Sequence, residues 1–246
     1  MNGPWTDGPR ELLQHAADHL GLGEDFDRRI AMISVDNAVE LAIKTYLGLP
    51  QRARGTKGPG RKELEAASES FPALLDMLDR YAADKLTGVD LGDVEWYHRL
   101  RNQLYHSGNG ITVERARVEA YFQIALALFE NLFGYVPHFN ERTFVHTKTG
   151  EFLHLWTRFD HLLRMQLPPK DGLAYYWKKE FLEGVSTEAA ALWDSLNWFR
   201  NNLVHSLETP DAANLDRSIR DLRRLIELLE QRAAQQSVAA DGARPA

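Results

Sequence analysis

Apolar residues recur at every third or fourth position through most of this chain, which is the pattern of helices that bury one face. The spacing predicts helices at residues 9–20, 24–49, 63–85, 91–107 and 113–133, and then at 152–167, 173–184, 187–206 and 211–234. Pro72 lies inside the third segment and is expected to kink or split it. The pattern therefore predicts an all-α protein.

Two of these segments carry the clearest stripes of core positions. In segment 24–49 the predicted inward residues are Ile30, Ile33, Ala38, Leu41 and either Thr45 or Tyr46. In segment 113–133, which we expect Thr112 to cap, they are Tyr121, Ile124, Ala125, Leu128 and Leu132. Both stripes predict helices that pack against others in a bundle.

The stretch from 134 to 150 breaks this pattern. Pro137 and Asn140 interrupt it, and a short hairpin around Thr149 and Gly150 is one interpretation. We therefore expect two domains, residues 1–136 and 137–246. The end of the second, from Ala233 onward, is expected to be a disordered tail.

One heptapeptide occurs twice. Residues 101–107 read Arg-Asn-Gln-Leu-Tyr-His-Ser, and 99 residues later residues 200–206 read Arg-Asn-Asn-Leu-Val-His-Ser, with five of seven positions identical. Each copy comes late in its half of the chain and follows an aromatic-rich segment. A repeat at this distance indicates duplication of a whole domain rather than a short solenoid unit.

These heptapeptides resemble the signature of the HEPN family, an all-α domain marked by an Arg followed four to six residues later by a His. Residues 36–47 also resemble an early helix of that family. The resemblance implies two tandem HEPN-like bundles packed as a pseudo-dimer. It further implies a metal-independent endoribonuclease whose active site forms where two motifs meet, in the setting of prokaryotic antiviral defence or a toxin–antitoxin pair.

The repeated residue types suit chemistry on a phosphate. On a helix, residues four apart share a face, so each motif offers an amide and an imidazole together, with a guanidinium close by and no carboxylate. Arginine binds phosphate oxygens in a two-pronged manner, and histidine can move protons near neutral pH. The candidate catalytic residues are Arg101, Asn102, His106, Arg200, Asn201 and His205.

A basic segment supplies candidate RNA-binding residues. Residues 51–62 contain five cations, three glycines and no acid, which predicts a mobile loop. The cations are Arg52, Arg54, Lys57, Arg61 and Lys62. The segment is either a solvated connector or a loop that grips phosphate. Lys178 and Lys179, by contrast, are expected on a solvated helix face.

Other interpretations of the motif stay open. Each Arg-Asn pair could satisfy hydrogen bonds between helices, and His106 and His205 could stabilise helix C-termini through the dipole. On that view the chain is a catalytically silent module that binds RNA or a nucleotide, or a scaffold for a partner protein. Five tryptophans are expected in the core or at a domain interface, with stacking on a base as the alternative: Trp96, Trp156, Trp177, Trp193 and Trp198.

Composition excludes several classes of protein. The chain has no cysteine, which excludes disulfides, thiolate catalysis and cysteine-based metal sites, and fits a cytoplasmic protein. The net charge of −6 argues against nonspecific coating of nucleic acid. No apolar run is long enough for a membrane span, and the N-terminus lacks a signal-peptide pattern. We expect no metal or cofactor, RNA as the substrate, and an antitoxin or regulatory protein or a second copy as further partners.

Overall fold

The computed structural model describes residues 3–106, 113–137, 139, 148–167, 174–205 and 211–242, without the side chains of residues 106, 174–176 and 237–242. Within these ranges every regular element is a helix, which confirms the all-α prediction. The chain divides into two compact units, Met1–Gly150 and Glu151–Ala246. Each unit is described by itself below.

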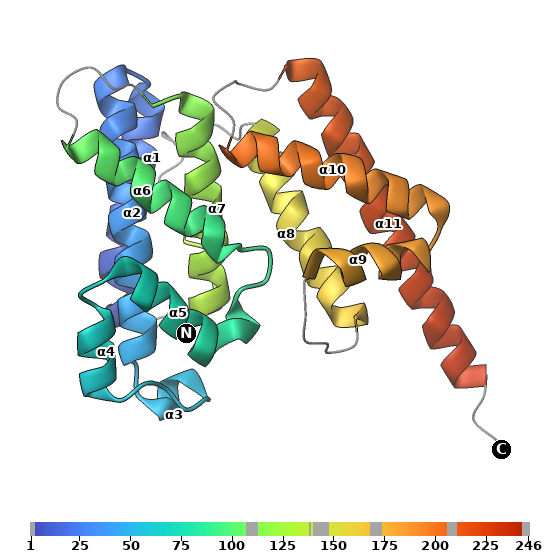
Figure 1. Cartoon of the computed structure of the whole chain (residues 1–246), viewed down its shortest axis with the longest axis horizontal. Coiled ribbons are helices and arrows are strands. Elements are labelled where there is room, and N and C mark those ends of the chain that lie inside the picture. The colour runs from blue at the N-terminus through green and yellow to red at the C-terminus, as the bar shows by residue number, and fades with distance from the viewer. Residues whose placement is uncertain are drawn as a thin grey trace. The chain divides into compact units, whose positions relative to one another are not determined.

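Unit 1 is a bundle built around one long helix. Its elements are η1 (Pro4–Thr6), α1 (Asp7–Leu22), α2 (Asp25–Gly48), α3 (Gln51–Arg54), α4 (Arg61–Ala67), α5 (Phe71–Ala82), η2 (Ala83–Lys85), α6 (Leu91–His106) and α7 (Arg115–Phe133). The central helix is α2, which contacts α1, α4, α5, α6 and α7 (Figure 1). The chain turns from α1 into α2 at Gly23, whose positive φ of 82° favours glycine.

The buried arc of α2 differs from the stripe that its sequence pattern predicts. Because helices pack on it from several directions, the buried positions include Ala31, Met32, Val35, Ala38, Val39, Ala42, Ile43 and Tyr46. Three predicted core residues lie outside this arc: Ile30 and Ile33 are half-buried, and Leu41 is 38% exposed. The predicted stripe of α7 is confirmed, since Tyr121, Ile124, Ala125, Leu128 and Leu132 are all buried.

Two helix boundaries of unit 1 can be compared with specific predictions. The segment with Pro72 is split as expected, because α4 ends at Ala67 and α5 begins at Phe71 with the proline in its first turn. Proline is tolerated there because the first N–H groups of a helix have no intrahelical acceptor. Helix α7 begins at Arg115 rather than at residue 113, and the predicted cap, Thr112, lies outside the described residues.

The basic segment is not one continuous loop, so that prediction is wrong. Residues 51–54 form the short helix α3, and Arg61 is the first residue of α4. Arg54 turns inward and is only 8% exposed, with its guanidinium 5.8 Å from the centre of the Tyr46 ring. Gly58 permits this arrangement, because a Cβ atom there would lie 1.4 Å from Arg54 Nη2. Arg54 is therefore part of the fold of unit 1.

Unit 2 contains four longer helices within its described residues. They are α8 (Lys148–Gln166), α9 (Ala174–Glu183), α10 (Thr187–His205) and α11 (Ala212–Gly242), and α10 contacts both α9 and α11. The core is aromatic: the Trp156 ring of α8 stacks on the Trp193 ring of α10 with centroids 5.7 Å apart. Two predictions are wrong here. Thr149 and Gly150 belong to α8 rather than to a hairpin, and α11 continues through residues 233–242 in place of the predicted disordered tail.

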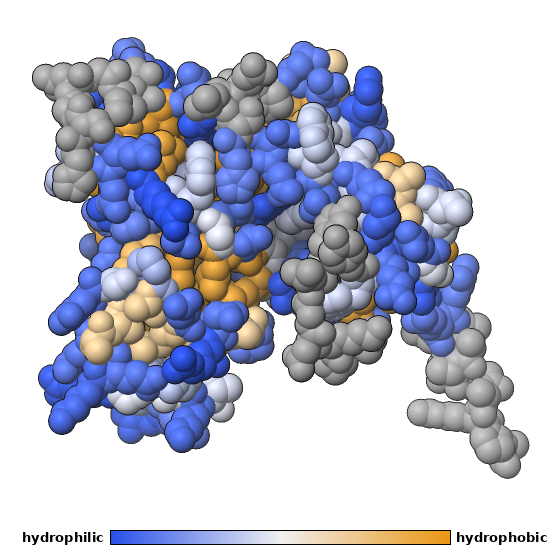
Figure 2. All heavy atoms as spheres, in the orientation of Figure 1, coloured by the Kyte–Doolittle hydropathy of each residue, from blue (hydrophilic) through white to orange (hydrophobic). Residues whose placement is uncertain are grey.

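On the face drawn in Figure 2, hydrophilic side chains cover most of the described surface, and apolar colour gathers mainly between the helices of unit 1. Among the described residues, no helix combines the length and the apolar character that crossing a bilayer requires. Burial of apolar side chains inside each unit is the main force that stabilises such bundles.

Candidate functional site

The most deeply buried polar group near the repeated motif is the carboxylate of Asp36. It lies on α2 among the apolar positions Val35, Ala38 and Val39, and its exposed fraction is 0%. A carboxylate buried in an apolar core is costly unless it is paired and hydrogen-bonded. Unit 1 meets this cost with donors from two neighbouring helices.

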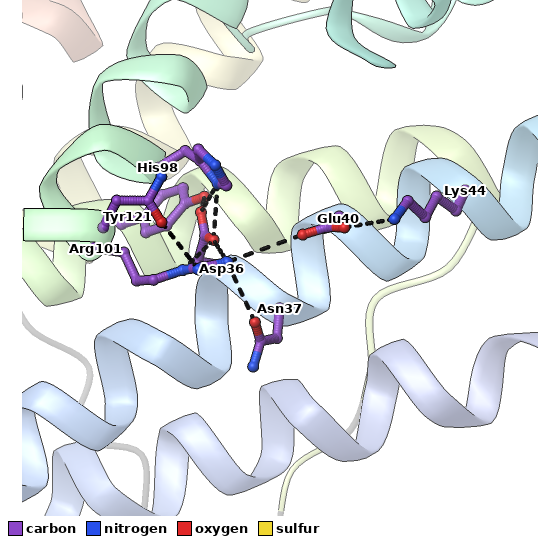
Figure 3. A network of polar contacts seen from close by, with 8 residues as sticks. Asp36, Asn37, Glu40, Lys44, His98, Arg101 and Tyr121 are labelled. Atoms are coloured by element: carbon purple, nitrogen blue, oxygen red, sulfur yellow. Dashed lines mark hydrogen bonds and ion pairs between the residues drawn. The ribbon is translucent and has the colours of Figure 1, made fainter. Parts of the chain in front are cut away.

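Three side chains converge on the Asp36 carboxylate (Figure 3). Tyr121 on α7 donates its hydroxyl to Asp36 Oδ1 at 2.8 Å. Arg101 on α6 donates through Nε to Asp36 Oδ2 at 2.7 Å, and its Nη2 lies 2.6 Å from the same oxygen. His98, one turn before Arg101, places Nδ1 3.0 Å from Asp36 Oδ2. The motif arginine is thus one member of a network that joins α2, α6 and α7.

The chemistry of the network fixes the protons of its members. Since the Asp36 carboxylate can only accept hydrogen bonds, the His98 proton is on Nδ1. The imidazole also stacks on Phe71 of α5, with ring centroids 3.8 Å apart and an interplanar angle of 8°. Burial, the Asp36 charge and the hydrogen bond to Asp36 together raise the pKa of the Tyr121 hydroxyl well above its ordinary value. Tyr121 therefore remains a donor wherever the protein is folded at ordinary pH.

The other side of the Arg101 guanidinium faces polar residues. Its Nη1 donates to Asn102 Oδ1 at 3.0 Å, and its Nη2 donates to Asn37 Oδ1 at 3.5 Å. Glu40 lies 3.9 Å from Nη2 and is itself bonded to Lys44, four residues further along α2. The Arg101 side chain keeps 17% of its surface accessible. It is held in one orientation while part of it reaches the surface.

The second motif arginine is also anchored, but by different contacts. Arg200 on α10 is 5% exposed, and its guanidinium lies over the Trp156 ring, 6.0 Å from the ring centre. Its Nη1 donates to Asn201 Oδ1 at 3.5 Å, which repeats the bond between Arg101 and Asn102. In both copies, therefore, the asparagine of the motif accepts from the arginine that precedes it.

Both motif histidines end their helices. His106 is the last residue of α6, and His205 is the last residue of α10. The His205 side chain is exposed, whereas that of His106 lies outside the part of the chain that the structure describes. The predicted position of both residues at helix C-termini is confirmed.

Unit 2 has its own buried carboxylate. Asp160 of α8 is 4% exposed and accepts from Lys178 Nζ of α9 at 2.6 Å and from Arg164 Nε at 2.7 Å. Lys178 also lies over the Trp193 ring at 6.0 Å. The prediction of a solvated Lys178 is therefore wrong, because the buried charge of Asp160 draws this cation into the unit.

Sequence reasoning missed three members of the network in unit 1. The motif predicts a site without a carboxylate, yet Asp36 supplies one, together with His98 and Tyr121. One signal was present in the sequence: an aspartate stands at a buried position of the apolar stripe of α2, where a charge needs a partner. The identity of that partner depends on packing between helices far apart in sequence.

Four of the five candidate RNA-binding cations stay at the surface. Arg52, Lys57, Arg61 and Lys62 are exposed, and Arg61 forms an ion pair with Glu65 at 2.9 Å. Arg54 is the exception, since its Nη1 and Nη2 donate to the backbone oxygens of Leu47 and Thr56, each at 3.4 Å. The exposed four can therefore meet a phosphate in solvent, whereas Arg54 is held by the fold.

Among the described residues no group of three or more His, Asp or Glu side chains is arranged to hold a metal ion. No protein-family model matches the chain, and neither a curated protein nor a solved structure matches it. The function must therefore be argued from the residues and their geometry.

Proposed function

We propose that this protein is a metal-independent endoribonuclease that uses the Arg-Asn-x-x-x-His motifs of both units. The proposal combines the repeat with the resemblance of both motifs to the HEPN signature. The proposed location of the enzyme is the cytoplasm. The observation that carries it is shared by the two copies: each motif arginine donates to the next asparagine, and each motif histidine ends its helix.

In the proposed reaction one imidazole removes the proton from a ribose 2′-hydroxyl. The oxygen then attacks the adjacent phosphorus, the bond from phosphorus to the 5′-oxygen breaks, and a second imidazole protonates that leaving oxygen. The products are a 2′,3′-cyclic phosphate and a 5′-hydroxyl. Cationic and amide groups stabilise the extra negative charge of the transition state, so no metal is needed.

A second candidate function has its own supporting observation. Both motif arginines are largely buried, and each has protein contacts, Arg101 with Asp36 and Arg200 with Trp156. These contacts favour arginines that stabilise the fold while exposed residues such as Asn201 and His205 bind RNA or a nucleotide without cleaving it. A cleavage assay separates this binding module from the nuclease.

The proposed setting is a defence or toxin–antitoxin system, in which an antitoxin or another regulatory protein would restrain the nuclease. A homodimer is compatible with this setting. These partners follow from the family resemblance alone.

The test is cleavage of a structured RNA by the full chain in EDTA, with the ends of the products mapped chemically. We expect cleavage to persist in the chelator and to leave cyclic phosphates. His205→Ala should abolish it, whereas His154→Ala, which changes an exposed histidine of α8 outside the motif, should not.

RNA that the folded wild-type protein binds but does not cut, with or without added metal, would support the binding module. Cleavage that needs Mg²⁺ would contradict the metal-free mechanism. Circular dichroism of each variant checks that a fall in activity does not come from unfolding.

A further inference from the structure

An exposed tryptophan stands out on α10. Trp198 is 69% exposed, whereas Trp156 and Trp193 of the same unit are 8% and 2% exposed. The core side of α10 is formed by other residues, namely Ala189, Trp193, Leu196, Phe199, Arg200, Leu203 and Val204. Trp198 is therefore out of phase with the core of unit 2.

Trp198 belongs to the solvent-facing stripe of the helix. The exposed positions recur at three- and four-residue spacing: Ala191, Asp194, Ser195, Trp198, Asn201 and His205. Trp198 is the one large aromatic residue in this stripe, and the stripe ends in the asparagine and histidine of the motif. Along the axis, seven residues separate Trp198 from His205, which is about 10 Å at 1.5 Å per residue.

The charges along the stripe suit an anionic strand on the motif side of Trp198. The nearest carboxylate on the exposed side of α10, Asp194, lies one turn before Trp198 and forms an ion pair with Lys179 at 2.6 Å. From Trp198 to His205 the sequence contains no acidic residue. The Asn202 side chain donates to the backbone oxygen of Trp198 at 3.1 Å, and Trp198 remains 69% exposed.

The other copy of the motif has a planar group at the same place. Ninety-nine residues before Trp198 stands Arg99, whose side chain is 70% exposed and which pairs with Glu95, one turn earlier on α6. Both units therefore present a flat, exposed side chain two residues before the motif arginine. Indole rings and guanidinium planes are both groups on which unpaired bases stack.

We propose that Trp198 is a stacking platform for an unpaired base of single-stranded RNA, with the strand running along α10 toward Asn201 and His205. This inference rests on the proposed function and names its substrate as unpaired rather than duplex RNA. The distance of about 10 Å corresponds to roughly three nucleotides of a stacked strand at 3.4 Å each. A base on Trp198 thus leaves a nearby phosphate within reach of the motif.

The surroundings favour a base over an apolar protein partner. The core of a protein–protein interface is a contiguous patch depleted in charged residues, in which several apolar side chains exclude water. Around Trp198 the exposed stripe is otherwise alanine and polar residues. Stacking on a single aromatic ring needs no such patch, because every base has a π-face.

The test measures binding separately from cleavage. A fluorescently labelled single-stranded octanucleotide with 2′-O-methyl riboses lacks the hydroxyl that would attack, so it is bound but not cut. We expect Trp198→Leu and Trp198→Ala to weaken its binding by about 5- to 150-fold, the usual effect of removing one base stack. Trp198→Phe keeps a planar ring and should retain most of the affinity.

Two controls accompany these variants. The same oligonucleotide paired with its complement should bind wild type and Trp198→Leu within about twofold of each other, because paired bases are already stacked. Trp5→Ala removes a different exposed tryptophan and should change neither affinity. The contrast between phenylalanine and leucine separates stacking from a general apolar contact.

Equal binding by wild type and Trp198→Leu would overturn the inference, as would equal weakening on single-stranded and duplex RNA. A change of sedimentation coefficient in Trp198→Leu would also overturn it, by assigning the tryptophan to a contact between copies.

Cleavage of unmodified RNA is measured in parallel. Cleavage with unchanged binding in Trp198→Leu defeats only the stacking platform, whereas Trp198-dependent binding without cleavage defeats only the nuclease. Wild type that neither binds nor cuts RNA defeats both.

Discussion

Each unit buries an aspartate inside a long core helix, Asp36 in unit 1 and Asp160 in unit 2, yet the two carboxylates are neutralised differently. Asp36 in unit 1 accepts from three side chains on two other helices, and the motif arginine, Arg101, is one of them. Asp160 in unit 2 accepts from Arg164 on its own helix and from Lys178 on α9. Arg200, the second motif arginine, lies over Trp156.

The sequence repeat predicts that the two motif arginines have the same role, but their contacts in the two units differ. The bond from arginine to the following asparagine and the histidine at the helix end occur in both units. The described contacts of the arginine side chain differ, since Arg101 pairs with the Asp36 carboxylate and Arg200 lies over the Trp156 ring. Features common to both copies are the better candidates for function, and those that differ are better candidates for folding.

The largest expected effect tests whether the two copies are equal in function. If His106 and His205 serve one reaction as base and acid, His106→Ala and His205→Ala should each lower the RNA cleavage rate by about 10²–10⁴. The double variant should be only slightly slower than either single variant, because groups that act as a unit are strongly non-additive.

Cleavage rates of the four proteins on one RNA, with EDTA present, provide the measurement. Two independent sites would give a different result: each single variant would keep about half the activity, and only the double variant would be inactive. That outcome would show that the two copies work separately in spite of their shared motif.

The second effect concerns stability. Asp36→Ala leaves the Arg101 guanidinium without its buried counter-ion, and breaking a buried ion pair in this way costs about 3–5 kcal/mol. Asp160→Ala should cost less, on the order of 1–3 kcal/mol, because the Arg164 side chain is 45% exposed and can return to water, which leaves Lys178, 17% exposed, as the partner that loses its counter-ion.

Hydrogen exchange followed by mass spectrometry reports on each unit separately. We expect Asp36→Ala to increase exchange in α6 and α7 while the helices of unit 2 keep their protection, and Asp160→Ala to do the reverse. If Asp36→Ala lowered protection in unit 1 by as much as Asp160→Ala lowers it in unit 2, the two networks would not differ in strength.

The third effect comes from Tyr121, whose hydroxyl bonds to a charged group. Tyr121→Phe should lower the free energy of unfolding at pH 7 by about 1.5–3 kcal/mol. Tyr135→Phe is a matched control, because Tyr135 donates at 2.8 Å to the neutral hydroxyl of Thr6, and it should cost about 0.5–1.5 kcal/mol.

Tyr121→Phe should also change how the free energy of unfolding depends on pH. Since burial raises the pKa of Tyr121 in the folded state, the folded protein keeps a proton that the unfolded chain releases above pH of about 10. The stability due to this group is fully present below that pH and falls as pH rises toward the folded pKa. Denaturant unfolding between pH 8 and 11 should show a steeper decline in wild type than in Tyr121→Phe, and parallel curves would contradict the raised pKa.

The sequence predicts much of the fold because periodicity is a local property. All the longer helices lie near their predicted positions, and the split at Pro72 follows from the geometry of proline. The errors arise where context overrides the pattern. Leu41 is exposed because several helices determine which side of α2 is buried, and the helix α3 forms in a segment whose glycines and charges favoured a loop.

The candidate site was less accessible to sequence reasoning. The repeat identified Arg101 and Arg200, but their burial and their partners depend on residues that lie far away in the sequence. Asp36 and Arg101 are 65 positions apart, and Asp36 and Tyr121 are 85 apart. A motif gives the identity of the chemical groups, whereas tertiary packing determines which of them are held by the core and which remain accessible.

The smallest effect concerns the basic segment, which is present in unit 1 and has no counterpart in the sequence of unit 2. Arg52, Lys57, Arg61 and Lys62 are exposed and can reach phosphates, while Arg54 is buried over Tyr46. Each phosphate contact with a single strand contributes about 0.7 to the slope of log K against log salt. Changing the four exposed cations to glutamine should therefore flatten that slope by roughly 0.7 for every cation that binds a phosphate, and should leave the cleavage products unchanged.

Arg54→Gln is the matched control within the same segment. It removes one cation, as each of the other changes does, but from a side chain that donates to the backbone of Leu47 and Thr56. We expect it to lower the thermal midpoint of unfolding and to leave the salt slope unchanged, whereas the four-cation variant should do the opposite. An unaltered slope in the four-cation variant would make the segment a solvated connector, and the affinity for RNA would then have to come from features that the two units share.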